Sequence, residues 1–557
     1  MFDTRLRVCL SALAAWWLVG CSQGFYKKWA DKQVFGILSE KSVALGNDDG
    51  EVLQSITPPA APSLSELEQQ QGASDFLGKR AFIEENARVL SLAKALDFAL
   101  HHNRTYLGRK ERVYLSALSL TAVRQRFGPI ADGGAFAQAD HTRQLASVNE
   151  TIRSTSLTSR GNLGVGVLLK TGAQLAVDLT EGFSRWVVGE GRSPWSPTVV
   201  VSASQPLLAG AGVLAAAEPL RQTERLVLYE VRDFAQYRKN FVVDVLRQSM
   251  RLMLLREQAR NRYTAYQSSL AALEREKALA AANLRSQSQL KQIEQGSLSY
   301  HRSWLAAVRS YEDALDDLKI QLGLPVRERF IIDPAELKRL AVIDGRVDLD
   351  ALVEVGLNSR TDLHNALDRL ADTQRKVKIF KQATLPGLSI GGTYSVQGNE
   401  RRNGADAWPS NPDRRLSGIV DLDLNLNQLP ERNDLRSAQI AEQAAARAWD
   451  LAQEELRGDL RADFRGLIVA RQQHDLAMQG LQLAQGRLEI EEALMAEGQG
   501  TARDIVESQD RLIVARDLLI STMIDHNIAR LQMWSDAGVL ELGKDPDWER
   551  VLKQEKP

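Results

Sequence analysis

Two aspartates near residue 420 come closest in this chain to a pair that could do hydrolytic chemistry. Asp421 and Asp423 are separated by one residue, and two carboxylates can share general acid and base or nucleophile work on a glycosidic bond. Aliphatic and polar residues alternate from 420 to 427, however, so both aspartates fall on one face of a strand with Asn425 and Asn427. We therefore interpret Asp421, Asp423 and Asn425 as a water-facing lining.

Other catalytic or metal-binding patterns are missing from the sequence. His101 and His102 are adjacent, which on a helix turns them about 100° apart, whereas metal-binding pairs are spaced four residues apart. There is no phosphate-binding loop, nucleophile elbow or His-Glu-x-x-His motif. We expect no enzyme activity, no metal site and no cofactor.

The first residues have the pattern of a targeting signal. Arg5 and Arg7 precede an apolar run, 8–18, that is too short for a permanent transmembrane helix. The run ends in Leu18-Val19-Gly20-Cys21, which resembles a bacterial lipobox. Cys21 would then carry palmitate and be the first mature residue, and Ser22 after it resembles lipoproteins sent to the outer membrane. The alternative is an ordinary signal peptide with an incidental cysteine.

Composition narrows the class of protein further. The 70 Lys and Arg nearly balance the 71 Asp and Glu, so the charge gives no reason to expect a nucleic-acid partner. Aromatic residues make up 6% of the chain, which is typical of long packed helices rather than a thick globular core. Only Cys9 accompanies Cys21 and would leave with the signal, so no disulfide is expected.

A short motif occurs twice and indicates a tandem duplication. Asn103-Arg104-Thr105-Tyr106-Leu107 returns as Ser359-Arg360-Thr361-Asp362-Leu363. Each occurrence leads to a β-like stretch, a very long helical segment, a glycine turn and a return helix. The predicted organisation is a signal peptide (1–20), a lipid-anchored extension (21–90), a first repeat (91–335), a second repeat (336–540) and a tail (541–557).

Each repeat is predicted to supply two strands, near 172–206 and near 387–427. Their apolar and polar residues alternate, and each is about 10 residues long, enough for a tilted strand to cross a bilayer. The alternative for such a strand is a half-buried sheet on a soluble core. Four strands cannot close a barrel, since small closed barrels need about 8. Closure must therefore come from other copies of the chain.

The helical segments, 211–293 and 431–495, are long enough to form a coiled-coil-like wall. The last return helix has a seven-residue seam that is broken only by His526, and a second stripe beside it. Two stripes suit a helix that contacts neighbours on both sides, whereas a bundle core explains one stripe. The seam consists of Ile505, Leu512, Leu519 and Met533, and the second stripe of Val506, Ile513 and Ile520.

Four segments together resemble the TolC-like outer-membrane efflux proteins. They are Leu169–Gly172, Ser204–Gly212, Glu218–Leu220 and the turn Gly498–Gln509. The resemblance covers about residues 91–540. It implies a mainly α fold with a membrane β-barrel portion, in which three chains form a 12-stranded β-barrel continued by a 12-helix α-barrel.

The resemblance also implies roles for residues near the helix turns. Asp504 and Glu507 match the family's acidic periplasmic aperture, and Arg302 is taken as the equivalent position in the first repeat. Gly296, Gly498 and Gly500 would lie in the tip turns that contact an adaptor. The alternatives are solvated helix residues for the two acids, and a purely structural need for positive φ at the glycines.

The expected function is the outer-membrane channel subunit of a tripartite efflux or type I secretion system. Its partners would be two further copies of the chain, a periplasmic adaptor (a membrane fusion protein), an inner-membrane transporter and outer-membrane lipid. The alternative is a periplasmic scaffold or adaptor lipoprotein with long hairpins and no pore. The duplicated hairpin and the lipid-length strands favour the channel.

Overall fold

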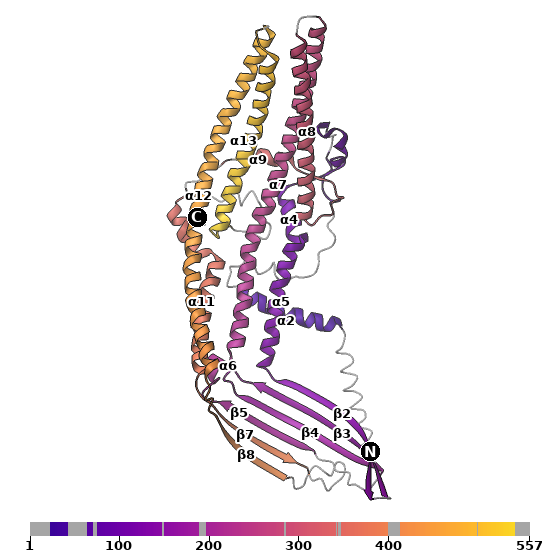
Figure 1. Cartoon of the computed structure of the whole chain (residues 1–557), viewed down its shortest axis with the longest axis vertical. Helices are drawn as coiled ribbons and strands as arrows, with labels where there is room; N and C mark the ends of the chain where they lie inside the picture. Colours follow the sequence, from indigo (N-terminus) through magenta and orange to yellow (C-terminus); the bar gives the residue numbers. More distant parts are fainter. Residues whose placement is uncertain are drawn as a thin grey trace. The chain divides into compact units, whose positions relative to one another are not determined.

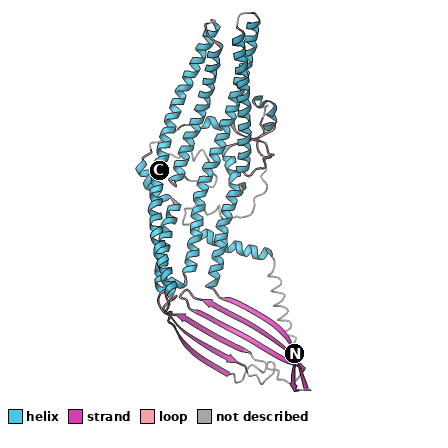
Figure 2. Cartoon of the chain, in the orientation of Figure 1, coloured by secondary structure: helices cyan, strands magenta, loops and turns pink. Residues whose placement is uncertain are grey.

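The structure is a computed structural model, mainly helical with one large sheet (Figure 2). The chain divides into two compact units: residues 1–41, 114–230 and 366–449, and residues 42–113, 231–365 and 450–557. Helices α5, α7, α11 and α12 contribute residues to both units. The described residues are 23–42, 64–70, 75–147, 150–188, 197–282, 286–340, 342, 347–398, 413–497 and 499–540, so the predicted lipidation site Cys21 lies outside them.

The first unit holds an antiparallel sheet of six strands (Figure 1). The prediction of four strands was therefore wrong. Sequence reasoning missed the two strands at one edge of the sheet. Along the outermost of them, the residues of one face from 131 to 139 are alanine and glycine, so its hydrophobic alternation is faint. In spatial order the strands are β2 (Ile130–Ser147), β3 (Glu150–Leu168), β4 (Gln174–Val188), β5 (Thr198–Pro206), β7 (Gly387–Gln397) and β8 (Asp413–Asp423).

Charged side chains hold the start of helix α7 (Glu218–Ala281) to helix α11 (Thr361–Ala383) in the first unit. Asp372 on α11 is 4% exposed and accepts a hydrogen bond from the Tyr229 hydroxyl at 2.7 Å. Arg375 donates to both carboxylate oxygens of Glu218, at 2.6 and 3.0 Å. Burial, together with the hydrogen bond to Asp372, raises the pKa of Tyr229 to about 12. These bonds join the start of α7, which follows one strand of the sheet, to α11, which precedes another.

Two helices add to the first unit. Helix α2 (Gln23–Ser42) buries Val34 and Leu38, and its Asp31 accepts a 2.7 Å hydrogen bond from Tyr114. The short helix α6 (Gly212–Ala216) leads into α7. Gln382 of α11 donates to the backbone oxygens of Leu208 and Ala211, which anchors the chain between β5 and α6.

Helices recur along the chain in the same order and with matching lengths. The first series is α4 (Leu92–His102, 11 residues), α5 (Arg104–Arg126, 23), α7 (64) and α8 (Gln287–Gln321, 35). The second series is α10 (Leu349–Ser359, 11), α11 (23), α12 (Leu429–Ala496, 68) and α13 (Ala502–Asp536, 35). Helix α12 begins two residues before its predicted start and includes Pro430, which its first turn tolerates because the N–H there has no helical acceptor.

The twice-occurring motif ties the beginning of each series to its end. The Asn103 amide donates to the backbone oxygen of Gln321, the last residue of α8, at 2.7 Å. In the second series Arg360 donates to the backbone oxygen of Asp536, the last residue of α13, at 2.9 Å. The motif therefore marks a junction that satisfies the otherwise open carbonyls of a helix C-terminus.

The segment before α4 packs on the long helices of the second unit. It contains a 3₁₀ helix, η2 (Asp75–Ile83), and strand β1 (Arg88–Leu90), which pairs in parallel with β6 (Phe330–Ile332) ahead of helix α9 (Pro334–Arg339). Glu84 is 1% exposed and forms a two-pronged ion pair with Arg256 of α7 at 2.8 Å. Tyr311 of α8 donates to the same carboxylate at 2.7 Å.

Candidate functional site

One face of the six-stranded sheet is apolar across every strand. The register aligns Leu163 of β3 with Leu179 of β4, and Val199 of β5 with Val396 of β7. Several of these side chains are largely open: Leu416 is 82% exposed. We call this the apolar face; it consists of Ala131, Ala135 and Ala137 of β2, Leu163, Val165 and Val167 of β3, Leu175, Val177 and Leu179 of β4, Val199, Val201 and Ala203 of β5, Leu388, Ile390, Tyr394 and Val396 of β7, and Leu416, Val420 and Leu422 of β8.

The opposite, polar face carries the predicted lining residues Asp421 and Asp423. Asp421 lies opposite Ser389, and Asp423 opposite Gly387. Asn425 lies beyond the end of β8 at Asp423, so the strand predicted to reach 427 is shorter. The Asn425 amide instead donates to Glu431 in the first turn of α12 at 2.7 Å. Elsewhere the polar face includes Asp132, Asn162, Asp178, Thr180, Ser202, Thr393, Ser395 and Ser417, together with the apolar Ile130, Phe136, Val200 and Ile419.

A glycine on the polar face keeps two further aspartates close to one another. A Cβ atom on Gly164 would lie 2.8 Å from Asp178 Oδ1 and 3.0 Å from Asp132 Oδ1. The two carboxylates, from β4 and β2, therefore both occupy the space that a side chain at Gly164 of β3 would fill. Sequence reasoning missed them because only the strand register brings these residues into one row. Among the described residues, no group of three His, Cys, Asp or Glu side chains could hold a metal ion.

Two of the four segments that resemble TolC-like proteins, 169–172 and 204–212, meet at one end of strands β4 and β5. Residues 169–173 form the turn from β3 into β4, and Gly172 there has φ +90°. Gln205 donates to the backbone oxygen of Thr171 at 3.2 Å. A Cβ on Gly172 would lie 3.1 Å from Pro206 Cγ, so this turn requires glycine both for its dihedral and for its space.

The first helix reversal was predicted at Gly296, but it does not lie there. Gly296 lies inside α8 and does not have a positive φ, so it is an ordinary helical glycine. A Cβ there would lie 3.9 Å from Val506 Cγ1 of α13. The reversal falls between Ala281 and Gln287, where Ser286 and Gln289 form a reciprocal capping box. That Ser-x-x-Gln pattern was the sequence signal for the true turn.

The second reversal lies where it was predicted, between Ala496 and Ala502. Gly498 itself lies outside the described residues. Gly500 donates to the backbone oxygen of Leu494 at 3.0 Å, and a Cβ on it would lie 2.8 Å from the Met495 nitrogen. No other residue fits that approach without a shift of the backbone.

The predicted aperture residues have local partners at the start of α13. Asp504 is the third residue of the helix, and the Thr501 N-cap hydroxyl donates to its carboxylate at 2.5 Å. Arg302 was taken as the equivalent position, but it lies fifteen residues beyond Gln287, the first residue of α8. Measured from the caps, the equivalent of Asp504 is Gln289. The assignment of Arg302 to the same level was wrong because it was counted from Gly296.

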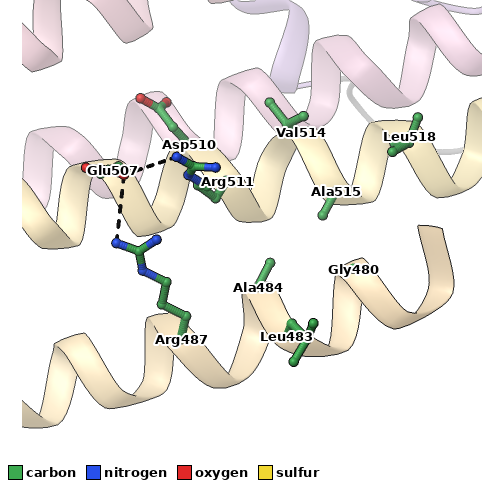
Figure 3. A pocket seen from close by; sticks show the side chains of 10 residues that line it. All are labelled: Gly480, Leu483, Ala484, Arg487, Glu507, Asp510, Arg511, Val514, Ala515 and Leu518. Carbon is green, nitrogen blue, oxygen red and sulfur yellow. Dashed lines mark hydrogen bonds and ion pairs between the residues drawn. The ribbon is translucent and has the colours of Figure 1, made fainter. Parts of the chain in front are cut away.

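Glu507 lies at the charged end of a groove between α12 and α13 (Figure 3). Arg511 donates to Glu507 at 3.3 Å, and Arg487 of α12 lies 3.8 Å from the same carboxylate. The groove has a volume of about 570 Å³, and Leu483, 76% exposed, is part of its apolar lining. Its other residues are Gly480, Ala484, Asp510, Val514, Ala515 and Leu518.

A set of acidic residues lies near the junction of the second series. Burial, together with the negative charges of Asp536 and Asp459, raises the pKa of Asp463 to about 7. Arg360 opposes the shift, and it donates to both oxygens of Asp362 at 2.6 and 2.8 Å. The Asp463 carboxyl therefore changes its charge near neutral pH.

The seam predicted on the last return helix is partly buried along its length. Leu512 and Met533 are buried, and Ile505 and Leu519 are half-buried. His526, which breaks the repeat, is itself 3% exposed. Ile513 of the second stripe joins a cluster with Ala265 of α7 and Tyr300 of α8.

Among the described residues, no helix is both long and apolar enough to span a membrane.

The arrangement of helices and strands is similar to several solved outer membrane channels. The CmeC outer membrane channel of Campylobacter jejuni has a TM-score of 0.60 at 14% identity, over 88% of this chain and 98% of that one. The Neisseria gonorrhoeae MtrE outer membrane channel in its open state has a TM-score of 0.57 at 14% identity, over 87% and 98%. VceC, an outer membrane protein of Vibrio cholerae, has a TM-score of 0.58 at 13% identity, over 80% and 96%.

These likenesses establish the fold. The chain has the mainly helical fold with a sheet portion that these outer membrane channels share, as the TolC-like resemblance implied. No family model matches the sequence, and no curated protein matches it either.

Proposed function

We propose that this chain, which has the fold of TolC-like channels, is the outer-membrane channel subunit of a tripartite efflux or type I secretion system. Three copies would form one duct that crosses the outer membrane and extends into the periplasm. The duct works by shape and charge, and no bond is made or broken in it. Its lipid anchor would be Cys21, after removal of residues 1–20.

The two-faced sheet is the observation that carries this proposal. Apolar side chains of all six strands share one face, and Asp132, Asp178, Asp421 and Asp423 share the other. This sidedness suits a wall with lipid outside and water inside. A sheet in lipid cannot keep an open edge, since every backbone N–H and C=O there needs a partner. Other copies of the chain would supply those partners.

The helix reversals would provide the contacts with the rest of the system. The two long hairpins reverse between Ala281 and Gln287 and between Ala496 and Ala502, and the groove beside Glu507 combines the exposed Leu483 and Leu518 with two arginines. An adaptor with an amphipathic helical hairpin could place apolar residues along Leu483 and Leu518 and an acidic residue near Arg487. Asp504 would place negative charge near the entrance, where it favours cations, whereas Glu507 is paired with Arg487 and Arg511.

Purification from outer membranes in mild detergent, followed by native mass spectrometry, tests the proposal. We expect a lipidated trimer lacking residues 1–20, and step-like currents when it is added to a planar lipid bilayer. The Cys21→Ser variant should lose the lipid mass and keep the trimer. A monomer that gives no current would contradict the channel and leave the scaffold reading.

A further inference from the structure

The two series of elements differ most in the length of chain between their second helix and the strand that pairs with the other series. In the second series, α11 ends at Ala383 and β7 begins at Gly387. In the first series, α5 ends at Arg126, but the strand that pairs with β5 does not begin until Gln174. The intervening chain forms the hairpin of β2 and β3. The hairpin is thus an addition to a pattern that otherwise needs two strands per series.

The hairpin is part of the same sheet and is not a separate ribbon. Strand β3 pairs with β4 from Leu168–Gln174 through Thr155–Val188 without a break in the first thirteen rows, and β2 pairs with β3 from Ile130–Gly166 outward. Each pairing is antiparallel. The hairpin therefore extends the sheet sideways by two strands.

Its side chains continue the two faces of the sheet. Leu163 and Val165 on β3 are 63% and 49% exposed and lie beside Leu179 and Val177 of β4 on the apolar face. On the polar face, Asp132 of β2 is in the same row as Asp178 of β4. A hairpin that lay outside the lipid-facing wall would have no need of an aliphatic face in register with its neighbours.

The outermost strands are then β2 and β8, and they run in opposite directions. Six antiparallel strands are an even number, so β2 of one copy meets β8 of the next in the antiparallel sense. Each of these strands has an outer edge with no partner strand among the described residues. In lipid that edge must be paired, and a second copy offers the complementary edge.

We propose that β2 pairs with β8 of a second copy, so that each chain supplies six strands and three copies close an 18-stranded barrel. This inference rests on the proposed channel function and corrects the strand number that the resemblance implied. Barrel diameter grows roughly linearly with strand number, so the lumen would be about 1.5 times as wide as that of a 12-stranded barrel. The system would pass correspondingly bulkier solutes through its outer-membrane part.

Cysteine cross-linking in the full chain tests which strand meets β8. One cysteine replaces Ser417 on the polar face of β8, and the second is moved along the same face of β2, at Ile130, Asp132, Gly134 and Phe136. We expect an oxidant to give covalent trimers at one or two of these positions. The matched control moves the second cysteine along β4, at Gln174, Ala176, Asp178 and Thr180, and should give none.

Cross-links from β8 to β4 and none to β2 would overturn the proposal, because the wall would then have four strands per chain. This failure differs from a failure of the proposed function. A chain that gives the β2–β8 links but carries no current would keep the 18-stranded ring and lose the channel. A chain that gives no trimer by native mass spectrometry would lose both.

The size of the lumen gives a second, independent measurement. In one variant, residues 127–173 are replaced by Thr-Leu-Pro, which is the link between α11 and β7. With Ser202→Cys as a reporter on the polar face of β5, maleimide-coupled poly(ethylene glycols) of increasing size probe access to the lumen. We expect the limiting radius to fall by about a third in the shortened chain. An unchanged limit would place the hairpin outside the wall.

Discussion

A glycine follows the return helix of each series and lies against the junction motif of the same series. Gly323 has φ +74°, and a Cβ on it would lie 2.2 Å from the His102 backbone oxygen. Gly538 has φ +72°, and its Cβ would lie 3.2 Å from the Ser359 backbone oxygen. Both positions need glycine for the left-handed backbone, and Gly323 needs it also for space.

Replacement of Gly323 by alanine should destabilise the protein far more than the same change at Gly210. Gly210 has φ +73° but nothing within 4 Å of a Cβ, so Gly210→Ala should cost only the left-handed strain, about 1–2 kcal/mol. Gly323→Ala adds a backbone clash with His102, and we expect a several-fold larger loss. Thermal unfolding of both purified variants makes the comparison. Equal losses would mean that the close approach at His102 relaxes without cost.

The stability of the second unit should depend on pH through Asp463. Its pKa in the fold, about 7, lies above the ordinary value of 3.8, so the folded state binds a proton that the unfolded state has released. The free energy of unfolding should therefore fall as pH rises from about 4 to about 7 and level off above that. Asp463→Asn removes this loss, and its melting temperature should exceed the wild-type value at pH 8 more than at pH 5.

Asp450→Asn is the control for that comparison, because Asp450 is exposed on the same helix. We expect its melting temperature to follow the wild type at both pH values. If Asp463→Asn were equally displaced from the wild type at pH 5 and pH 8, the carboxyl would not be the titrating group.

At the scale of elements, the segment before α4 is held to α7 and α8 by one buried carboxylate. Glu84 and Arg256 have side-chain exposures of 0% and 6%, and Tyr311 completes the set. The Trp304 indole also donates to the backbone oxygen of Phe76 at 2.7 Å. These contacts explain how residues 75–90, which have little repeat character in sequence, become an integral part of the second unit.

Arg256→Ala should cost roughly 3–5 kcal/mol of stability, since it leaves the Glu84 charge buried without its partner. The double variant Arg256→Ala, Glu84→Gln should recover part of that loss because no unpaired charge remains. Lys277→Ala, which removes an exposed pair with Glu274 on the same helix, should change stability by less than about 0.5 kcal/mol. Denaturant unfolding of the three variants checks these values, and no recovery in the double variant would argue against the charge as the cause.

Sequence alone was sufficient for the elements whose hydrophobic period is strong. The long helices, strands β4, β5, β7 and β8, and the second reversal were predicted close to their observed places. The β2–β3 hairpin was missed because its edge strand alternates alanine and glycine with polar residues, a contrast too weak to read. The first reversal was missed because Gly296 was given more weight than the capping box at Ser286.

Contacts between segments far apart in sequence were beyond prediction. The row of Asp132, Gly164 and Asp178 depends on strand register, and the pair of Glu84 and Arg256 joins residues 172 positions apart. Arg302 was misplaced for the related reason that one wrong turn shifts the whole count along a helix. Composition and periodicity predict elements, whereas sites are set by how elements meet.

At the scale of the whole molecule, the two faces of the sheet should respond oppositely to a new charge. Val201 and Ser202 are neighbours in the middle of β5 and belong to the apolar and polar faces. Val201→Arg should cost about 2–4 kcal/mol in lipid and reduce the amount of trimer in the outer membrane. Ser202→Arg should assemble normally and alter ion selectivity instead. Equal assembly of both variants would contradict a lipid-facing side at Val201.

The β2–β3 hairpin also sets the symmetry that a passing solute would meet. Helices α8 and α13 have equal lengths and equivalent junctions, so a ring of three chains presents six nearly identical helix pairs. The hairpin belongs to the first series alone, so the strand wall repeats only three times around its axis. The paired carboxylates at Asp132 and Asp178 would then form three separate acidic sites around the axis, in addition to the six carboxylates that Asp421 and Asp423 of three copies contribute, instead of an even ring of charge.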